Sequence, residues 1–180
     1  MPKTERYKAK VAVQRKITLD EKCKTCLQDP ILKAGMEDLL AFLRELKMKP
    51  TWYHGASYKC QYKKQAVVYI TVYNYDNCFV NVATVSAIDN TCRNNVSDFV
   101  RTLDNEMKAE FISYFKPCDN YNEKGYSCCQ FCDVEVDGIV YPNVCKGTKT
   151  YNIKKPTPEQ FTWIKKFIVA RRKYIEDTVI

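Results

Sequence analysis

Apolar residues recur every three or four positions in the first half of the chain, a pattern typical of a helix with one buried face. The pattern begins at Asp29-Pro30, where Asp is a favoured N-cap and Pro fits the first turn. We expect this helix to run until Pro50 ends it. A shorter helical turn, capped by Thr18 or Asp20, is expected to precede it and to reach Leu27.

Two further amphipathic stretches predict helices in the second half. One opens at Asn94 or Ser97 and continues to about Phe115, with an aromatic stripe that we expect to pack in the core. The other opens at Thr157-Pro158-Glu159-Gln160, which is a capping box with proline at the first helical position. Its apolar face extends to Ile175, and Arg171 to Lys173 are expected in its last turns, where they would complement the helix dipole.

Between the helices, alternating runs rich in Val, Ile and Tyr predict an antiparallel meander. Lys63-Lys64-Gln65 is the expected turn between the first two strands, and Asp137-Gly138 is the expected turn of a later hairpin over 134–141. Residues 9–17 are predicted to form an edge strand or to stay extended. The remaining predicted strands are 58–62, 66–73, 78–85 and 151–153.

These elements predict an α+β protein. We expect an antiparallel sheet of three to five strands, packed by two or three helices, with a cysteine-bearing hairpin. Residues 1–17 would form a basic N-terminal arm or edge strand, and residues 18–180 a single domain. Within that domain, residues 116–148 are a distinct subregion that holds five of the ten cysteines and three of the five glycines.

Charge is distributed unevenly along the 180 residues. The formal net charge is +8, but residues 1–16 hold six Lys or Arg against Glu5 alone. The other 164 residues are therefore nearly balanced. A nucleic-acid-binding protein usually gathers its basic residues on a folded surface. This distribution argues against nucleic-acid binding and leaves a basic adaptor acting through the arm as a third hypothesis.

No stretch approaches the roughly 20 apolar residues that a membrane-spanning helix needs. The start, Met1 to Arg6, lacks the apolar core of a secretory signal. We therefore expect a cytoplasmic protein with no membrane segment, in which cysteines are thiols, metal ligands or small core residues. The sequence does not indicate an oligomeric state.

The cysteine-rich subregion contains a candidate structural zinc site. Cys129 and Cys132 form a C-x2-C pair, which lets two thiolates of one turn reach a tetrahedral ion. A hairpin through Asp137-Gly138 would return Cys145 to that turn, and Cys118 would be the fourth ligand, with Cys128 as its substitute. The alternatives are reduced thiols packed under a loop, or a disulfide.

Several short motifs together carry a resemblance. They include Asp29-Pro30-Ile31-Leu32, Lys49-Pro50-Thr51-Trp52, Tyr58-x-x-x-Tyr62-Lys63, Cys129-x-x-Cys132 and the ending Arg171-Arg172-Lys173-Tyr174-Ile175. Over about residues 18–176, the chain resembles a group of uncharacterised small cysteine-containing bacterial proteins from anaerobes. The resemblance implies a shared fold and assigns no activity.

Two further features bear on chemistry. Cys23-Lys24-Thr25-Cys26 is a second C-x2-C, and thiolates near a helix N-terminus with lysines nearby have a lowered pKa. It does not follow a strand as a thioredoxin-like motif would, so ordinary helix-face thiols are the alternative. His54 could pair with Cys60 or Cys78 as a base and nucleophile, but no third orienting residue is evident; a structural or solvent-facing histidine is the alternative.

Tyrosine is abundant, with thirteen residues, most of them in 53–75 and 114–126. Aromatic side chains on a small sheet either pack in the core or line a cleft for a flat apolar or cationic ligand. The leading hypothesis is a non-enzymatic module that binds a small molecule or protein partner over its aromatic sheet. The alternative is a thiol-dependent enzyme or a redox or metal sensor that uses the C-x2-C cysteines.

Overall fold

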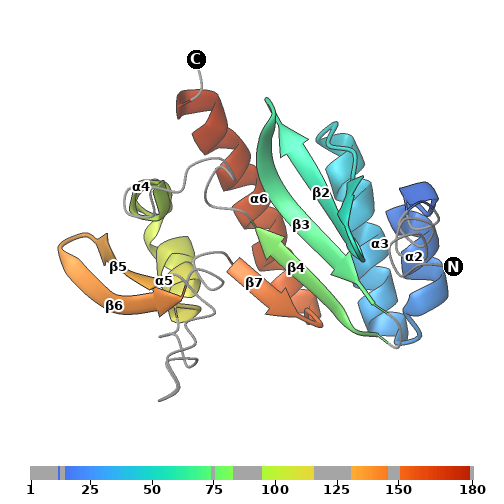
Figure 1. Cartoon of the computed structure of the whole chain (residues 1–180). Coiled ribbons are helices and arrows are strands. Elements are labelled where there is room, and N and C mark those ends of the chain that lie inside the picture. Colours follow the sequence, from blue (N-terminus) through green and yellow to red (C-terminus); the bar gives the residue numbers. More distant parts are fainter. Residues whose placement is uncertain are drawn as a thin grey trace, which may run out of the picture.

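The chain folds as an α+β protein, as the sequence predicted (Figure 1). The computed structural model describes Ala12 and residues 15–73, 76–82, 95–115, 131–145 and 151–178. These residues form five helices, a five-stranded antiparallel sheet and a two-stranded ribbon. The helices are α2 (Leu19–Cys26), α3 (Pro30–Glu45), α4 (Asn95–Arg101), α5 (Asn105–Ser113) and α6 (Pro158–Thr178). The strands are β1 (Thr51–His54), β2 (Ser57–Tyr62), β3 (Gln65–Val72), β4 (Cys78–Val82), β5 (Phe131–Val136), β6 (Ile139–Cys145) and β7 (Tyr151–Lys154).

The large sheet has the strand order β1-β2-β3-β4-β7, with every neighbouring pair antiparallel. The predicted turn at Lys63-Lys64 is confirmed, and both residues adopt positive φ, as a tight two-residue hairpin requires. Strand β1 was not predicted. It lies at the edge of the sheet and carries no alternating apolar pattern, since only Trp52 of its four residues is half-buried.

Helices α3 and α6 cover one face of this sheet (Figure 1). Their N-terminal caps are the predicted ones: the Asp29 side chain accepts hydrogen bonds from the backbone of Ile31 and Leu32, and Thr157 precedes the first turn of α6. Helix α3 ends at Glu45, five residues before Pro50, because Lys47 leaves the helical region with a φ of 57°. The two helices contact each other at Gly35, where an added Cβ would overlap the buried ring of Phe161.

The single long helix predicted for 94–115 is wrong, because the stretch forms two helices. Helix α4 ends at Arg101, and α5 begins after Asp104, whose carboxylate caps the new helix by accepting from the Met107 backbone. The break lets the aromatic residues on both sides reach a common core, in which Phe99 and Phe111 meet edge to face at 5.8 Å. Glu110 then joins α5 to the sheet by accepting a 2.7 Å hydrogen bond from the Tyr151 hydroxyl.

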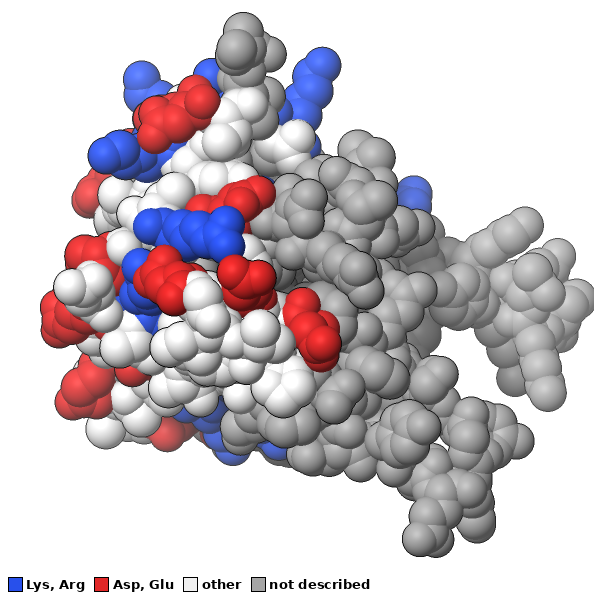
Figure 2. All heavy atoms as spheres, turned by 90° about the vertical axis from the view of Figure 1, so that its left-hand side faces the viewer, with Lys and Arg blue, Asp and Glu red and all other residues white. Residues whose placement is uncertain are grey.

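The predicted hairpin at Asp137-Gly138 is confirmed as the β5–β6 ribbon, with both turn residues at positive φ. The ribbon lies beside α4 and α5, beyond the β7 edge of the sheet (Figure 1). Val134, Val136 and Val144 are buried with the main core. The side of the molecule shown in Figure 2 carries both acidic and basic side chains, spread among uncharged ones.

Two expectations about the basic segments are wrong. The described residues of 9–17 do not form a strand, because Ala12, Arg15 and Lys16 are helical. Arg171 does not complement a helix end, because α6 continues to Thr178 and the Arg171 side chain is buried. It lies against the rings of Phe99 and Tyr174, so its role is packing inside the core.

In the described part of the chain, no helix combines the length and apolar character needed to cross a membrane.

Candidate functional site

A pocket of about 500 Å³ opens where the segment before α2, the end of α3 and the edge strand β1 meet. This volume falls in the range of small-molecule sites. The pocket lies on the helical side of the sheet, since Trp52 and Tyr58 form a cross-strand pair whose side chains point toward the core. It is lined by Arg15, Lys16, Ile17, Thr18, Leu19, Asp20, Arg44, Lys47, Met48, Lys49, Pro50, Trp52 and Tyr58.

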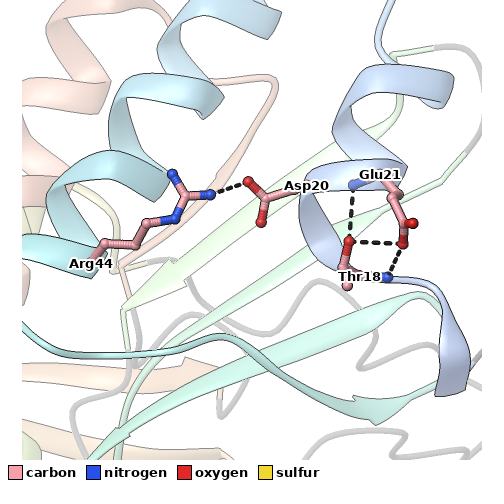
Figure 3. A network of polar contacts seen from close by, with 4 residues as sticks. All are labelled: Thr18, Asp20, Glu21 and Arg44. Carbon is pink, nitrogen blue, oxygen red and sulfur yellow. Dashed lines mark hydrogen bonds and ion pairs between the residues drawn. The ribbon is translucent and has the colours of Figure 1, made fainter.

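One wall of the pocket is fixed by the start of α2 (Figure 3). Thr18 and Glu21 form a capping box, in which the Glu21 carboxylate accepts from the Thr18 backbone at 2.7 Å and from its hydroxyl at 2.8 Å. These hydrogen bonds lower the pKa of Glu21 and hold that carboxylate at the cap. Asp20, on the same turn, forms an ion pair with Arg44 of α3. The wall is therefore rigid at the backbone, and the carboxylate that faces the pocket is already paired.

The floor of the pocket is apolar, and hydrogen bonds hold its two aromatic side chains, Trp52 and Tyr58, in place. Leu19, Met48 and Tyr58 are each at most 2% exposed. The Tyr58 hydroxyl donates a 2.7 Å hydrogen bond to the carbonyl of Ile17, which joins the segment before α2 to the sheet. Trp52 is half-buried, and its Nε1 donates to the Gly55 carbonyl at 3.1 Å. This bond fixes the plane of the indole ring.

The rim of the pocket is basic. Among its described lining residues, five are Lys or Arg and only Asp20 is a carboxylate, which leaves a formal excess of four positive charges. The Arg15 guanidinium stacks over the Trp52 ring at 4.8 Å. Lys47 and Lys49 flank the buried Met48 and are both exposed. Cations around an apolar floor fit a ligand with an apolar body and an anionic head.

No pattern in the sequence alone identifies this pocket. Its basic residues come from two regions, 15–16 and 44–49, which lie up to 34 positions apart, and neither region forms a recognisable motif. Two signals were present in the sequence: the concentration of charge before residue 17, and the run Lys47-Met48-Lys49 just before Trp52. Neither shows that the two regions meet, because the tertiary fold brings them together.

In the C-x2-C pair on α2, for which redox chemistry was one of two hypotheses, Cys23 lacks the environment of a reactive thiol. Cys23 is 1% exposed and packs in the core. Burial is the main cause that raises its pKa to about 12, whereas a nucleophilic cysteine needs a lowered pKa. Cys26 is half-buried on the same helix, with its sulfur 3.6 Å from the Thr25 hydroxyl. The positions favour structural thiols over redox chemistry.

The suggested pairing of His54 with a cysteine meets the same obstacle. His54 is exposed at the end of β1, and its ring lies 4.6 Å from that of Tyr53. Cys60 and Cys78 are buried on the core side of the sheet, and burial raises their pKa values to about 12 and about 11. Neither thiol is therefore prepared to act as a nucleophile at neutral pH.

The candidate zinc site stays a prediction. Cys118 and Cys129, and the substitute Cys128, lie outside the described residues. For Cys132 and Cys145 only the backbone is described: they lie on β5 and β6, where Cys132 pairs with Val144 and Phe131 with Cys145. The hairpin thus returns the chain as the prediction requires. Within the described ranges, no group of three His, Cys, Asp or Glu side chains is placed to hold a metal ion.

The tyrosines divide between the core and the sheet surface. Tyr58 and Tyr151 are buried on the helical side, whereas Tyr53, Tyr69 and Tyr73 belong to the opposite side and are exposed or half-buried. The Tyr53 and Tyr69 rings lie 5.4 Å apart. Core packing is therefore confirmed for Tyr58 and Tyr151, whereas a ligand cleft lined by tyrosines stays a prediction.

Comparison of the chain with models of known protein families, with curated proteins and with solved structures gives no match. The resemblance to small bacterial proteins therefore stays a prediction.

Proposed function

We propose that this protein is a non-enzymatic module that binds a small amphipathic anion in the pocket beside Trp52. The observation that carries the proposal is the combination of an apolar floor with a basic rim in a pocket of about 500 Å³. The ligand class is an organic molecule with a hydrocarbon or aromatic body and a carboxylate or phosphate head.

The roles of the residues follow from their positions. Leu19 and Met48 would contact the apolar body, and the indole of Trp52 would provide the edge of that surface. Lys47 and Lys49 would bind the head by charge-assisted hydrogen bonds, which are stronger than neutral ones. Arg15, now stacked on Trp52, supplies a guanidinium that can turn toward the head while it keeps its ring contact.

Binding rather than catalysis is favoured by what surrounds the pocket. The part of its lining that the structure describes holds no cysteine and no histidine, and its one carboxylate, Asp20, is paired with Arg44. General acid–base or nucleophilic chemistry needs a group that can accept a proton or attack near neutral pH. The lysines and arginines of the exposed rim are cations, and they would serve to attract an anion.

Binding of decyl phosphate and decanoate, with decanol as the neutral control, tests the proposal. Trp163→Phe leaves Trp52 as the sole tryptophan, so its fluorescence reports on the pocket. We expect saturable one-to-one binding of both anions, with decanol at least tenfold weaker. Lys47→Gln and Lys49→Gln together should weaken the anions at least fivefold, whereas the exposed Lys173→Gln on α6 should not. Equal affinity for decanol, or unchanged affinity in the double variant, would contradict the proposal.

A further inference from the structure

The second face of the five-stranded sheet has no helix of the described chain packed on it. Helices α3 and α6 both lie on the other side (Figure 1). The strand register shows which residues share this uncovered face. In one row across the sheet, Lys59 of β2 pairs with Tyr69 of β3. In the next row, Ser57, Thr71, Phe79 and Lys154 follow one another on β2, β3, β4 and β7. Trp52 and Tyr53 are neighbours in β1, yet Trp52 lines the pocket while Tyr53 contacts Tyr69 on the uncovered face. The two surfaces are therefore separate.

Aromatic rings form two pairs on the uncovered face. Tyr53 and Tyr69 are 5.4 Å apart between centroids, and Tyr73 and Phe79 are 6.4 Å apart. Tyr53 and Tyr73 remain 41% and 48% exposed, so their rings are available for stacking. Tyr69 and Phe79 are diagonal neighbours on adjacent strands, a relation that places side chains ~7–8 Å apart. The face thus offers a row of π-surfaces rather than one isolated ring.

Lysines accompany both aromatic pairs. The Lys59 ammonium lies 5.3 Å from the Tyr53 centroid, and that of Lys154 lies 5.7 Å from Phe79. The five strands of the sheet contain no Asp or Glu at all, although the chain has 21 acidic residues. The carboxylate of Asp76, in the turn between β3 and β4, accepts hydrogen bonds from the backbone N–H groups of Gln28 and Asp29. No strand of the five-stranded sheet therefore contributes a carboxylate, and the uncovered face is basic as well as aromatic.

We propose that the uncovered face binds single-stranded nucleic acid. Bases would stack on the Tyr53–Tyr69 and Tyr73–Phe79 pairs, and the backbone phosphates would be neutralised by Lys59 and Lys154. Stacking on exposed aromatic side chains beside cations is the general mode by which proteins hold unpaired bases, because every base has a π-face. A duplex hides those faces and is not expected to bind here.

The charge distribution along the sequence argued against nucleic acid because the basic excess lies in the first 16 residues. The fold changes that assessment. The five strands of the large sheet contribute lysines without carboxylates, whereas the described acidic residues lie on helices, at helix caps, in turns and on β5 of the separate ribbon. Some of these acidic side chains are seen on the surface in Figure 2. The chain after residue 16 is nearly balanced in charge as a whole, but the strands contribute only positive charge to the uncovered face of the sheet. The proposal is independent of the pocket beside Trp52, since no residue named for stacking or charge lines that pocket.

Fluorescence anisotropy with labelled 12-nucleotide dT and rU strands, and with a 12-base-pair duplex, tests the proposal on the full-length protein. We expect both single strands to bind at 20 mM salt and the duplex to bind at least tenfold more weakly. Affinity should fall with salt with a logarithmic slope of about −1.4, the value for two phosphate contacts on a single strand.

Matched variants locate the binding on the face. Tyr53→Ala and Tyr73→Ala, both at exposed positions, should each weaken binding at least fivefold, whereas Tyr53→Phe should retain it because the ring remains. Lys59→Gln and Lys154→Gln should reduce the salt slope, and Lys173→Gln on α6 should not. Thermal unfolding confirms that each variant is folded.

Three outcomes would overturn the proposal. One is the absence of strand binding up to 100 µM protein at 20 mM salt. Another is strand binding that does not depend on the exposed rings, shown either by equal affinity for single strand and duplex or by unchanged affinity in both tyrosine-to-alanine variants. The third is binding to vesicles containing phosphatidylserine, lost in Tyr53→Ala, without oligonucleotide binding, because it would assign the face to a membrane surface instead.

Discussion

Arg44, in the last turn of α3, and Asp20, in the first turn of α2, form an ion pair that joins two helices across one wall of the basic pocket (Figure 3). Both side chains remain roughly half exposed, at 56% and 43%. Exposed pairs of this kind contribute only about 0–1 kcal/mol to stability. The pair therefore matters more for the charge of the pocket than for the fold.

Asp20→Asn removes the one carboxylate that the described lining of the pocket contains, and it releases the Arg44 guanidinium from its ion pair. We expect affinity for decyl phosphate to rise by about threefold to fivefold, as the loss of an interaction of up to about 1 kcal/mol would allow. The free energy of unfolding should change by less than about 1 kcal/mol. Calorimetric titration measures the first quantity and urea denaturation the second. Asp177→Asn on α6 is the charge-matched control, and equal gains in both variants would show a general field effect rather than a pocket effect.

The capping box at Thr18 and Glu21 predicts a pH dependence. Hydrogen bonds from Thr18 lower the pKa of Glu21 below its ordinary value of 4.5. Because the folded pKa is the lower one, ionised Glu21 stabilises the fold above about pH 4.5, and this contribution is lost as the pH falls through the folded pKa. The melting-temperature difference between wild type and Glu21→Gln should therefore be largest near pH 7 and should shrink below pH 4.

The other half of the same box gives a second measurement. Thr18→Ala should lower the free energy of unfolding by about 1 kcal/mol, the usual cost of losing an N-cap. Thr18→Ser keeps the hydroxyl and should lose much less. If the melting-temperature difference between wild type and Glu21→Gln stays constant from pH 7 to pH 3, the ionised carboxylate does not have this stabilising role.

Gly35 allows the close approach of α3 and α6. Alanine is normally the better helix former by about 1 kcal/mol, but a Cβ here would overlap the Phe161 ring, which is only 4% exposed. Gly35→Ala should therefore destabilise the protein, by about 1–3 kcal/mol as overpacking does. Adding Phe161→Leu should make the Gly35→Ala cost smaller than in wild type. The neighbouring Ala34 is exposed, so the higher helix propensity of alanine over glycine should decide the outcome there. Ala34→Gly should therefore also destabilise the protein, by up to about 1 kcal/mol.

Buried thiols predict a pattern of chemical labelling. Cys23, Cys60 and Cys78 are free thiols, each at most 1% exposed, and burial raises their pKa values to about 12, about 12 and about 11. Iodoacetamide at pH 8 should leave all three unmodified in the folded protein and modify them in guanidinium chloride, as mass spectrometry of peptides would show. Rapid labelling of Cys23 in the folded state would revive the redox hypothesis for the α2 pair.

Elements specified by local chemistry were predictable. Asp29-Pro30, Thr157-Pro158 and Asp137-Gly138 each satisfy a backbone requirement within a few residues, so the starts of α3 and α6 and the turn of the β5–β6 ribbon are visible in the sequence. The division of 94–115 into two helices was missed because its apolar spacing continues through the break. The Asp104 cap is a local signal for the break, but the competing periodicity is stronger.

The sequence by itself determined the secondary structure of most of the sheet, the caps of the long helices and the buried nature of their apolar faces, because hydrogen-bonding and burial requirements repeat at short range. Tertiary structure alone decided where charge and aromatic rings gather. Arg15, Arg44 and Lys49 share a pocket, and Tyr53, Tyr69 and Lys154 share a sheet face, only after distant segments meet. Such sites are not periodic along the chain, since their geometry depends on strand order and on which side of the sheet the helices cover.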